Sequence, residues 1–235
     1  MVRPEVSVAA LDGHILLWIA IPLFVAIFVA AAIASSKRRK NLAAWCQARG
    51  LRFDESRVEH LDQVFPHCQC FALGDRRHGY NQIRGRLNGR EVWGFDYEYT
   101  TGSGKSQTTH TMSAVSVQSG FPLKPLLIRP EGFFDKVAEF FGAEDIKFES
   151  AEFSRKFCVK SPDRKWAYDV LHERTMEFLL SSGERYTIQF DGMNVVVWKE
   201  AQFAVADYDA AVGVACGILD RMPAYLVQQQ QTETV

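Results

Sequence analysis

The longest apolar stretch of the chain lies near its N-terminus. From Ile15 to Ala34 there are 20 residues without a charge, and 12 of them are Ile, Leu, Val or Phe. A helix of this length rises about 30 Å, which matches the hydrocarbon core of a bilayer. At about −0.3 to −0.6 kcal/mol for each strongly apolar residue, these side chains contribute roughly −4 to −7 kcal/mol to insertion. The pattern predicts a transmembrane helix over residues 15–34, with Pro22 tolerated in its first third.

The charges that flank this stretch predict its orientation. Four consecutive basic residues follow it directly: Lys37, Arg38, Arg39 and Lys40. By the positive-inside rule, residues 37 onward lie in the cytoplasm and residues 1–14 outside. The same four side chains are the expected membrane-contact residues and can attract anionic headgroups, at about 1 kcal/mol each, although a stop-transfer and topology signal without a specific lipid is the favoured interpretation. One alternative stays open, because residues 32–34 (Ala-Ile-Ala) resemble the cleavage site of a secretory signal peptide.

The rest of the chain alternates between short helices and strands. Apolar positions at helical spacing predict helices over 41–50, 54–65, 161–182 with a break near His172, and 207–222 with Asp207 as its cap. Alternation with a period of two predicts strands over 82–87 and 91–99. Further strands are expected over 106–117 and 126–129, and a second hairpin over 186–199. Extended pieces are expected near 146–149 and 157–160, and a helix after Pro130 with a phenylalanine-rich face over 133–141.

These elements predict an α+β fold, with a mostly antiparallel sheet and packed helices, behind one transmembrane helix. The expected segments are an extracytoplasmic N-terminus (1–14), the transmembrane helix (15–34), a basic juxtamembrane helix (35–50), a cytoplasmic α+β domain (51–226) and a disordered tail (227–235).

The turn at Asn88-Gly89 allows two registers for its hairpin. A two-residue loop pairs Arg84 with Trp93 and sets a polar side chain against an aromatic one. A three-residue loop, with Gly89 left-handed in a bulge, pairs Ile83 with Trp93 and keeps the apolar residues together. The pattern favours the bulged turn.

Composition narrows the possible functions only a little. The net charge of −1 provides no overall field toward nucleic acid, so no nucleic-acid partner is expected. Five cysteines without regular spacing are a poor disulfide framework and fit free thiols in a reducing compartment.

Two short motifs resemble ligand sites. Residues 102–106 (Gly-Ser-Gly-Lys-Ser) resemble the end of a phosphate-binding loop, but Tyr99 stands where the first glycine belongs and strand-forming residues follow. A hairpin loop is the favoured interpretation. His67, Cys68 and Cys70, with His60 and His78 nearby, carry metal-ligand chemistry, but no second pair stands at partner spacing. We expect no metal or cofactor, and expect Cys68 and Cys70 on the core face of a strand.

No catalytic residue is expected either. No nucleophile elbow is present, and His110 and His172 are interpreted as surface or hydrogen-bonded histidines. Asp96 and Glu98 share a strand face, where cross-strand arginines such as Arg84 and Arg86 favour a solvated, charge-paired surface over a catalytic pair. The aromatic row on the other face is expected to pack against the helix over 133–141 rather than to stack bases: Trp93, Phe95, Tyr97 and Tyr99.

Four segments together carry a resemblance: Phe95–Tyr99, Leu127–Gly132, Phe148–Phe153 and Phe157–Trp166. In this order, behind an anchor and a basic stop, the chain resembles an uncharacterised bacterial family of small membrane-anchored proteins over roughly residues 40–222. The resemblance implies a bacterial source and a cytoplasmic-membrane location, and it supplies no catalytic residues.

The leading hypothesis is therefore a single-pass, membrane-anchored protein whose cytoplasmic domain binds a protein partner, a lipid headgroup or a small ligand without catalysis. The alternative is a hydrolase-type enzyme at the membrane, with a site assembled from distant residues.

Overall fold

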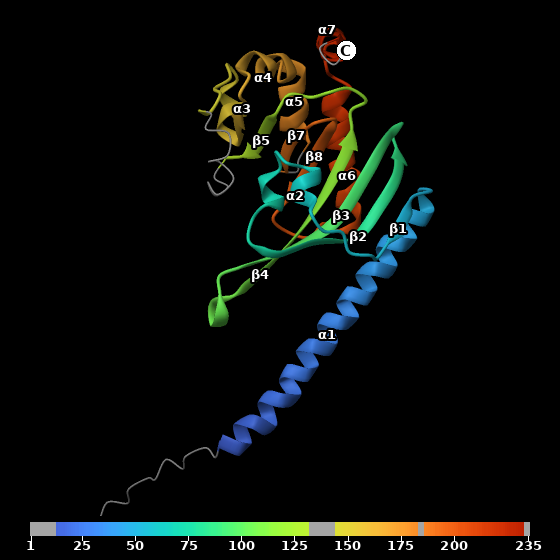
Figure 1. The fold of residues 1–235 in the computed structure, drawn as a ribbon, viewed down its shortest axis with the longest axis vertical. Coiled ribbons are helices and arrows are strands. Elements are labelled where there is room, and N and C mark those ends of the chain that lie inside the picture. The colour runs from blue at the N-terminus through green and yellow to red at the C-terminus, as the bar shows by residue number, and fades with distance from the viewer. Residues whose placement is uncertain (1–12, 132–143, 183–185, 233–235) are drawn as a thin grey trace, which may run out of the picture. The chain divides into compact units, whose positions relative to one another are not determined.

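The computed structural model describes residues 13–131, 144–182 and 186–232, with side chains from residue 21 onward (Figure 1). The chain divides into two compact units, residues 1–41 and residues 42–235. The described part of the first unit is helical and belongs to α1 (Gly13–Ala48), which also contributes its last turns to the second unit.

The first unit presents apolar side chains to its surroundings. Pro22 lies inside α1, and the helix continues past it. Phe24 and Phe28 are 73% and 71% exposed. Among the described residues, α1 alone is by itself long and apolar enough to cross a membrane, since α6 and α7 meet that criterion only as a pair bent by 83°. The predicted transmembrane and juxtamembrane helices thus form one uninterrupted helix.

The second unit is built on one antiparallel sheet of eight strands, in the order β1-β2-β3-β4-β8-β7-β5-β6. Their bounds are β1 (Arg52–Asp54), β2 (Asp75–Leu87), β3 (Arg90–Thr101), β4 (Thr108–Gln118), β5 (Leu126–Pro130), β6 (Phe157–Lys160), β7 (Thr187–Asp191) and β8 (Asn194–Lys199). The pairing of β4 with β8, which sets Val115 opposite Val197, joins the N-terminal meander to the C-terminal strands. The chain is α+β, as predicted.

Short helices connect and cover the strands. They are α2 (Leu61–Val64), η1 (Gln69–Phe71), η2 (Gly104–Ser106), α3 (Ala151–Lys156), α4 (Arg164–Val170), α5 (Glu173–Ser181), α6 (Val205–Leu219) and α7 (Ala224–Thr232). Side chains cap two of them: Ser150 accepts from the third residue of α3, and Asp163 does so for α4. The predicted break near His172 is present. It separates α4 from α5, because the backbone of Leu171 is not helical.

The sheet is covered on both faces. The longest helix of this unit, α6, lies over one face with α4 and α5, and the main core there includes Val115, Ile188 and Val197 (Figure 1). The segment that carries α2 and η1 lies over the other face, where Phe65 and Phe71 contact the aromatic row of β3. Both faces are therefore buried, which is why several strands carry apolar residues at consecutive positions.

The last turns of α1 are part of the second unit. Leu42 and Cys46 are buried in the main core. Trp45 donates from Nε1 to Oδ2 of Asp209 in α6 at 3.1 Å, and Arg49 donates to both carboxylate oxygens at 2.9 and 2.6 Å. The guanidinium of Arg49 also lies 4.5 Å from the centre of the Trp45 ring. Asp209 thus holds the end of α1 against α6.

The register of the β2–β3 hairpin differs from the predicted one. Leu87 pairs with Arg90 and Arg84 with Trp93, so the turn is the two-residue loop and the bulged turn is wrong. The polar–aromatic pair is favourable because the Arg84 guanidinium stacks 4.0 Å above the Trp93 ring. The irregularities of this pair lie elsewhere in β2, between Asp75 and His78 and between Tyr80 and Ile83.

Three other predicted segments differ. The helix predicted over 54–65 is confined to Leu61–Val64, because Asp54 pairs with β2 and Val58 bridges to Gly79. Residues 146–149 are not a strand, although the N–H of Ile146 bonds to Val159. The tail predicted as disordered is helical to Thr232, and Leu226 anchors it in the core. The helix predicted over 133–141 lies outside the described residues.

The remaining elements agree with the sequence patterns. The strands predicted over 106–117, 126–129, 157–160 and 186–199 are present as β4, β5, β6 and the β7–β8 hairpin. Asp207 lies in the first turn of α6 instead of preceding it, where it accepts from the N–H of Ala204 at 2.9 Å.

Candidate functional site

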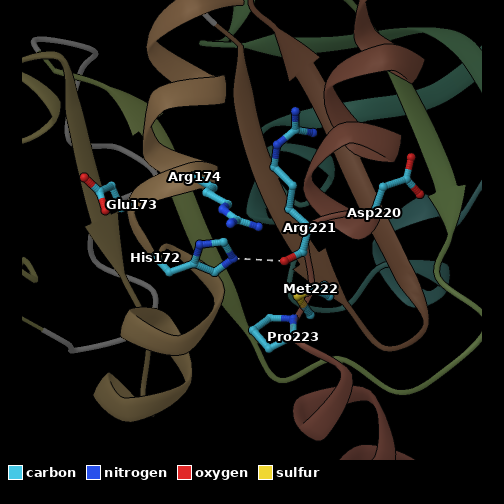
Figure 2. A pocket seen from close by; sticks show the side chains of 7 residues that line it. All are labelled: His172, Glu173, Arg174, Asp220, Arg221, Met222 and Pro223. Atoms are coloured by element: carbon cyan, nitrogen blue, oxygen red, sulfur yellow. Dashed lines mark hydrogen bonds between the residues drawn. The ribbon is translucent and has the colours of Figure 1, made fainter.

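An open cavity of about 640 Å³ lies where the start of α5 meets the end of α6 (Figure 2). It is lined by His172, Glu173, Arg174, Asp220, Arg221, Met222 and Pro223. Two guanidinium groups, two carboxylates and an imidazole supply its polar groups.

A close contact between two helices positions this cavity. Gly217 of α6 faces the ring of Phe178 of α5, and a Cβ placed on Gly217 would lie 2.6 Å from Cε1 of that ring. Only glycine allows this approach. Arg221 also contacts Phe178, with its guanidinium 4.2 Å from the centre of the ring. The packing of α5 on α6 therefore sets where Arg221 stands.

Hydrogen bonds hold the backbone around the cavity. Nε2 of His172 lies 2.9 Å from the carbonyl oxygen of Arg221, which can only accept, so this ring nitrogen carries the hydrogen. Arg221 donates from Nη1 to the carbonyl of Gly217 at 2.8 Å. The buried Thr175 places its hydroxyl 3.3 Å from the same ring nitrogen of His172. The bond between His172 and Arg221 connects the start of α5 to the end of α6, and the other two contacts are local.

The charged side chains of the lining point in different directions. Figure 2 shows Arg174 extending toward the backbone of Arg221, whose own guanidinium points away along α6, while Glu173 and Asp220 point to opposite sides. Asp220 pairs with Arg90 at 2.9 Å, outside the cavity. Arg174 is exposed and has no hydrogen-bond or ion-pair partner within the described part of the chain. The lining therefore combines two arginines with two carboxylates, one of which is paired with Arg90.

The four basic residues predicted to contact the membrane lie together on α1. Lys37, Arg38, Arg39 and Lys40 follow the exposed apolar part of the helix without a break. Lys37 and Lys40 are exposed, and Arg39 donates to Oγ of Ser35 at 3.4 Å, one turn earlier. The four residues thus form a basic stretch directly after an apolar helical segment.

The glycine-rich segment at residues 102–106 is a hairpin loop. It contains the single 3₁₀ turn of η2, and β4 begins two residues after Ser106. The hydroxyl of Ser106 donates to the carbonyl of Ser103 at 2.9 Å, within the loop itself. No helix follows the lysine, so the loop lacks the helix N-terminus that holds a phosphate in nucleotide-binding loops.

The cysteine pair is buried, but not in a strand. Cys68 precedes η1 and Cys70 lies within it, and burial raises the pKa of both thiols well above the usual value. The side chain of His67 faces Asp191, with its Nδ1 2.9 Å from Oδ1 of the carboxylate, and the backbone N–H of His67 donates to Oδ2. Among the described residues, no group of three or more His, Cys, Asp or Glu has a geometry suited to a metal ion.

The prediction for the two strand carboxylates is wrong for Asp96. Its side chain is fully buried under α6 and accepts from Asn81 at 2.8 Å, Ser113 at 2.5 Å and Tyr208 at 3.2 Å. The expected arginine partners lie elsewhere: Arg84 stacks on Trp93 across the sheet, and Arg86 pairs with Glu91. Burial between the sheet and α6 thus replaces solvent around Asp96 with the donors of its three hydrogen-bond partners.

The aromatic row is a core feature, as predicted, and among the described residues the α2–η1 segment covers it. Phe95, Tyr97 and Tyr99 are buried beneath the α2–η1 segment, and the hydroxyl of Tyr97 donates to the carbonyl of Phe71 at 2.7 Å. Burial raises the pKa of Tyr97. At the end of the row, His110 stacks on Tyr99 and its Nε2 lies 2.7 Å from the Thr101 hydroxyl.

The cavity residues could not be found from the sequence. His172 was considered only as an isolated histidine, and Arg174 and Arg221 belong to no motif. They are brought together by the packing of α5 on α6, to which Gly217 is the one local signal, since a glycine inside a helix often marks a close approach.

The fold and these sites define a class: an α+β protein with an eight-stranded antiparallel sheet, preceded by a candidate membrane helix. Neither protein families nor curated sequences give a match to the chain. Among solved structures, the chain is similar to the mycobacterial trehalose monomycolate transport factor A, TtfA, with a TM-score of 0.59 and 13% identity over 78% of this chain and 92% of that one. At this identity the likeness shows the fold alone.

Proposed function

We propose that the protein is a single-pass protein of the bacterial cytoplasmic membrane, with a non-enzymatic binding domain in the cytoplasm. In this proposal residues 15–34 span the bilayer and residues 1–14 lie outside. Lys37, Arg38, Arg39 and Lys40 lie at the cytoplasmic headgroups, where they fix the orientation and attract anionic lipid. Residues 51–226 form the domain, whose partner is a protein, a headgroup or a small ligand.

One observation carries the proposal: an exposed, uncharged helical segment runs directly into four basic residues on the same helix. Exposed apolar side chains over this length have no favourable environment in water, whereas a bilayer supplies one. Tethering also raises the effective concentration of the domain near other membrane components, so weak contacts suffice for binding. The neighbour of similar fold is named a transport factor, which agrees with a binding role.

Reporter fusions at Val235 test the orientation. Alkaline phosphatase is active only outside the cytoplasm and green fluorescent protein folds to its fluorescent form inside it, so the second fusion should be fluorescent and the first inactive. The intact protein should also stay in the membrane pellet after carbonate extraction. An active phosphatase fusion, or release by carbonate, would contradict the proposal.

A matched pair of variants tests the basic residues. Replacing residues 37–40 together with glutamine should give a mixed or inverted topology, because these charges lie directly beside the span. The control replaces four basic residues of the domain with glutamine: Arg155, Lys156, Arg164 and Lys165. They lie too far along the chain to direct insertion, so this variant should keep the wild-type topology. Equal effects in the two variants would refute the role of residues 37–40.

A further inference from the structure

We propose that the β3–β4 hairpin is a self-association surface, where β4 pairs antiparallel with the same strand of a second copy of the chain. The contact is made by the side of β4 that has no neighbouring strand from Thr108 to Met112, called here its free side. This inference names a partner for the binding role proposed above and rests on that role.

The free side exists because β4 is longer than β8. β3 pairs with β4 from Thr108 to Val117, whereas β8 pairs only with Ser113–Gln118. Figure 1 shows the hairpin projecting beyond the end of β8. Among the described residues, no backbone group bonds to the free side between Thr108 and Met112. The first five residues of β4 therefore have one neighbouring strand instead of two.

The alternation of the backbone shows which groups point to the free side. Successive residues of a strand direct their N–H and C=O to opposite neighbours. The N–H of Ser113 bonds to the carbonyl of Ala201, on the β8 side, at 3.2 Å. Thr111 and Thr109 direct their backbone groups to this same side, beyond the end of β8, and both residues are exposed. A row of unpaired donors and acceptors is what an added β-strand recognises.

The strand is complementary to itself. Two antiparallel copies of one strand are related by a two-fold axis. With Thr109 on this axis, its N–H and C=O bond to the C=O and N–H of Thr109 in the second copy, and facing threonines are a favourable cross-strand pair. The same register sets Thr111 opposite Gln107, whose backbone is extended, with φ −67° and ψ 129°. Native sheets often protect such strands with lysine or proline, and Thr108–Met112 contains neither.

Two charges beside the free side favour a second copy over an unrelated strand. In the register centred on Thr109, the loop residue Lys105 lies beside Ser113 of the other copy. Ser113 bonds to Ala201, which directly follows Glu200. Lys105 and Glu200 are both exposed, and neither has an ion-pair partner within the described ranges. The axis generates this contact twice, so each copy supplies one cation and one anion.

Sedimentation equilibrium of the full chain in density-matched neutral detergent measures the pairing. Thr109→Lys places two like charges at the two-fold axis and should raise the dissociation constant of the dimer about tenfold. Gln118→Lys is the matched control, because Gln118 is exposed at the other end of β4, where β8 is the neighbouring strand. This variant should dimerise as wild type does. Both variants should unfold at the wild-type temperature, since both side chains are exposed.

Charge exchange tests whether the partner is a second copy. Lys105→Glu and Glu200→Lys should each raise the dissociation constant about threefold to tenfold, because each sets like charges side by side at both contacts. An equimolar mixture of these two variants should form mixed dimers about as tight as wild type. In a mixed dimer both contacts join opposite charges, although neither chain alone carries a restored pair.

Three results would overturn the proposal. These are a wild-type chain that stays monomeric up to about 1 mM, a dimer that Thr109→Lys leaves as tight as wild type, and a mixture of the two charge variants that associates no better than its components. Because detergent replaces the bilayer in these measurements, a failure here leaves the reporter-fusion test of the anchor unaffected. A failed anchor, in turn, would not alter the dissociation constant measured in detergent.

Discussion

Replacing Gly217 by alanine should destabilise the protein relative to the same replacement at Gly213, four residues earlier in α6. Alanine is favoured over glycine inside a helix by about 1 kcal/mol, and this gain applies at both positions. A Cβ on Gly213 meets nothing within 4 Å, so Gly213→Ala should raise the stability by about that amount. A Cβ on Gly217 overlaps the Phe178 ring, 2.6 Å from Cε1.

The size of the difference follows from this overlap. Either the ring of Phe178 or the whole of α5 must move, and overpacking of this kind costs about 1–3 kcal/mol. Since the helix-propensity gain is common to both variants, the difference between them should equal the overpacking cost. For a chain of this size each kcal/mol corresponds to about 2–4 °C in the unfolding temperature.

Thermal unfolding of the full chain in detergent, followed by tryptophan fluorescence, measures both changes. The double variants with Phe178→Ala serve as the internal control, because removal of the ring should make the two glycine replacements equally favourable. If Gly217→Ala were as stabilising as Gly213→Ala with Phe178 present, the close packing of α5 on α6 would be refuted, and with it the positioning of Arg221.

Two further predictions concern charged contacts of the second unit. Asp163→Asn should destabilise the protein by up to about 1 kcal/mol at neutral pH. Hydrogen bonds from the Trp166 N–H and then from Lys124 lower the pKa of Asp163. The stabilisation is therefore present above about pH 4 and is lost as the pH falls through the lowered pKa. Urea unfolding at pH 7 and pH 3 should therefore show a difference from wild type that shrinks in acid, and a constant difference would contradict the assignment. Asp209→Ala should lower the free energy of unfolding by about 1–2 kcal/mol, because it removes both acceptors of Arg49 and leaves the Trp45 N–H without one. Asp209→Asn should recover part of this loss. Equal losses in the two variants would show that the Trp45 bond contributes nothing.

The elements with a clear period were predictable, and the errors occur where a tertiary contact outweighed the local pattern. The alternation over residues 91–99 identified β3 and its aromatic face, because burial of one face imposes the period directly. The hairpin register was mispredicted because apolar matching was given precedence, whereas stacking of Arg84 on Trp93 makes the polar–aromatic pair favourable. The C-terminal tail appears polar, yet it is helical to Thr232, with Leu226 and Gln230 of the same helix buried.

The candidate sites also differ in whether the sequence alone can predict them. The four basic residues proposed to contact the membrane are contiguous in sequence, so a linear pattern is enough to propose them. The residues of the α5–α6 cavity come from segments separated by roughly 50 positions, and no spacing rule connects His172 with Arg221. Asp96 illustrates the converse, since its alternation with Phe95 and Tyr97 indicated a solvated face, while the cover provided by α6 could not be seen in the strand itself.

The pairing of β4 with β8 has a consequence for synthesis of the chain. The N-terminal meander emerges from the ribosome long before Asn194–Lys199, which supply the neighbour of β4. During that interval the backbone N–H and C=O groups along β4 form an open edge that can pair with another nascent chain. Truncations that end before β8 should therefore aggregate rather than yield a soluble half-domain, and slow translation through the intervening segment should lower the yield of folded protein.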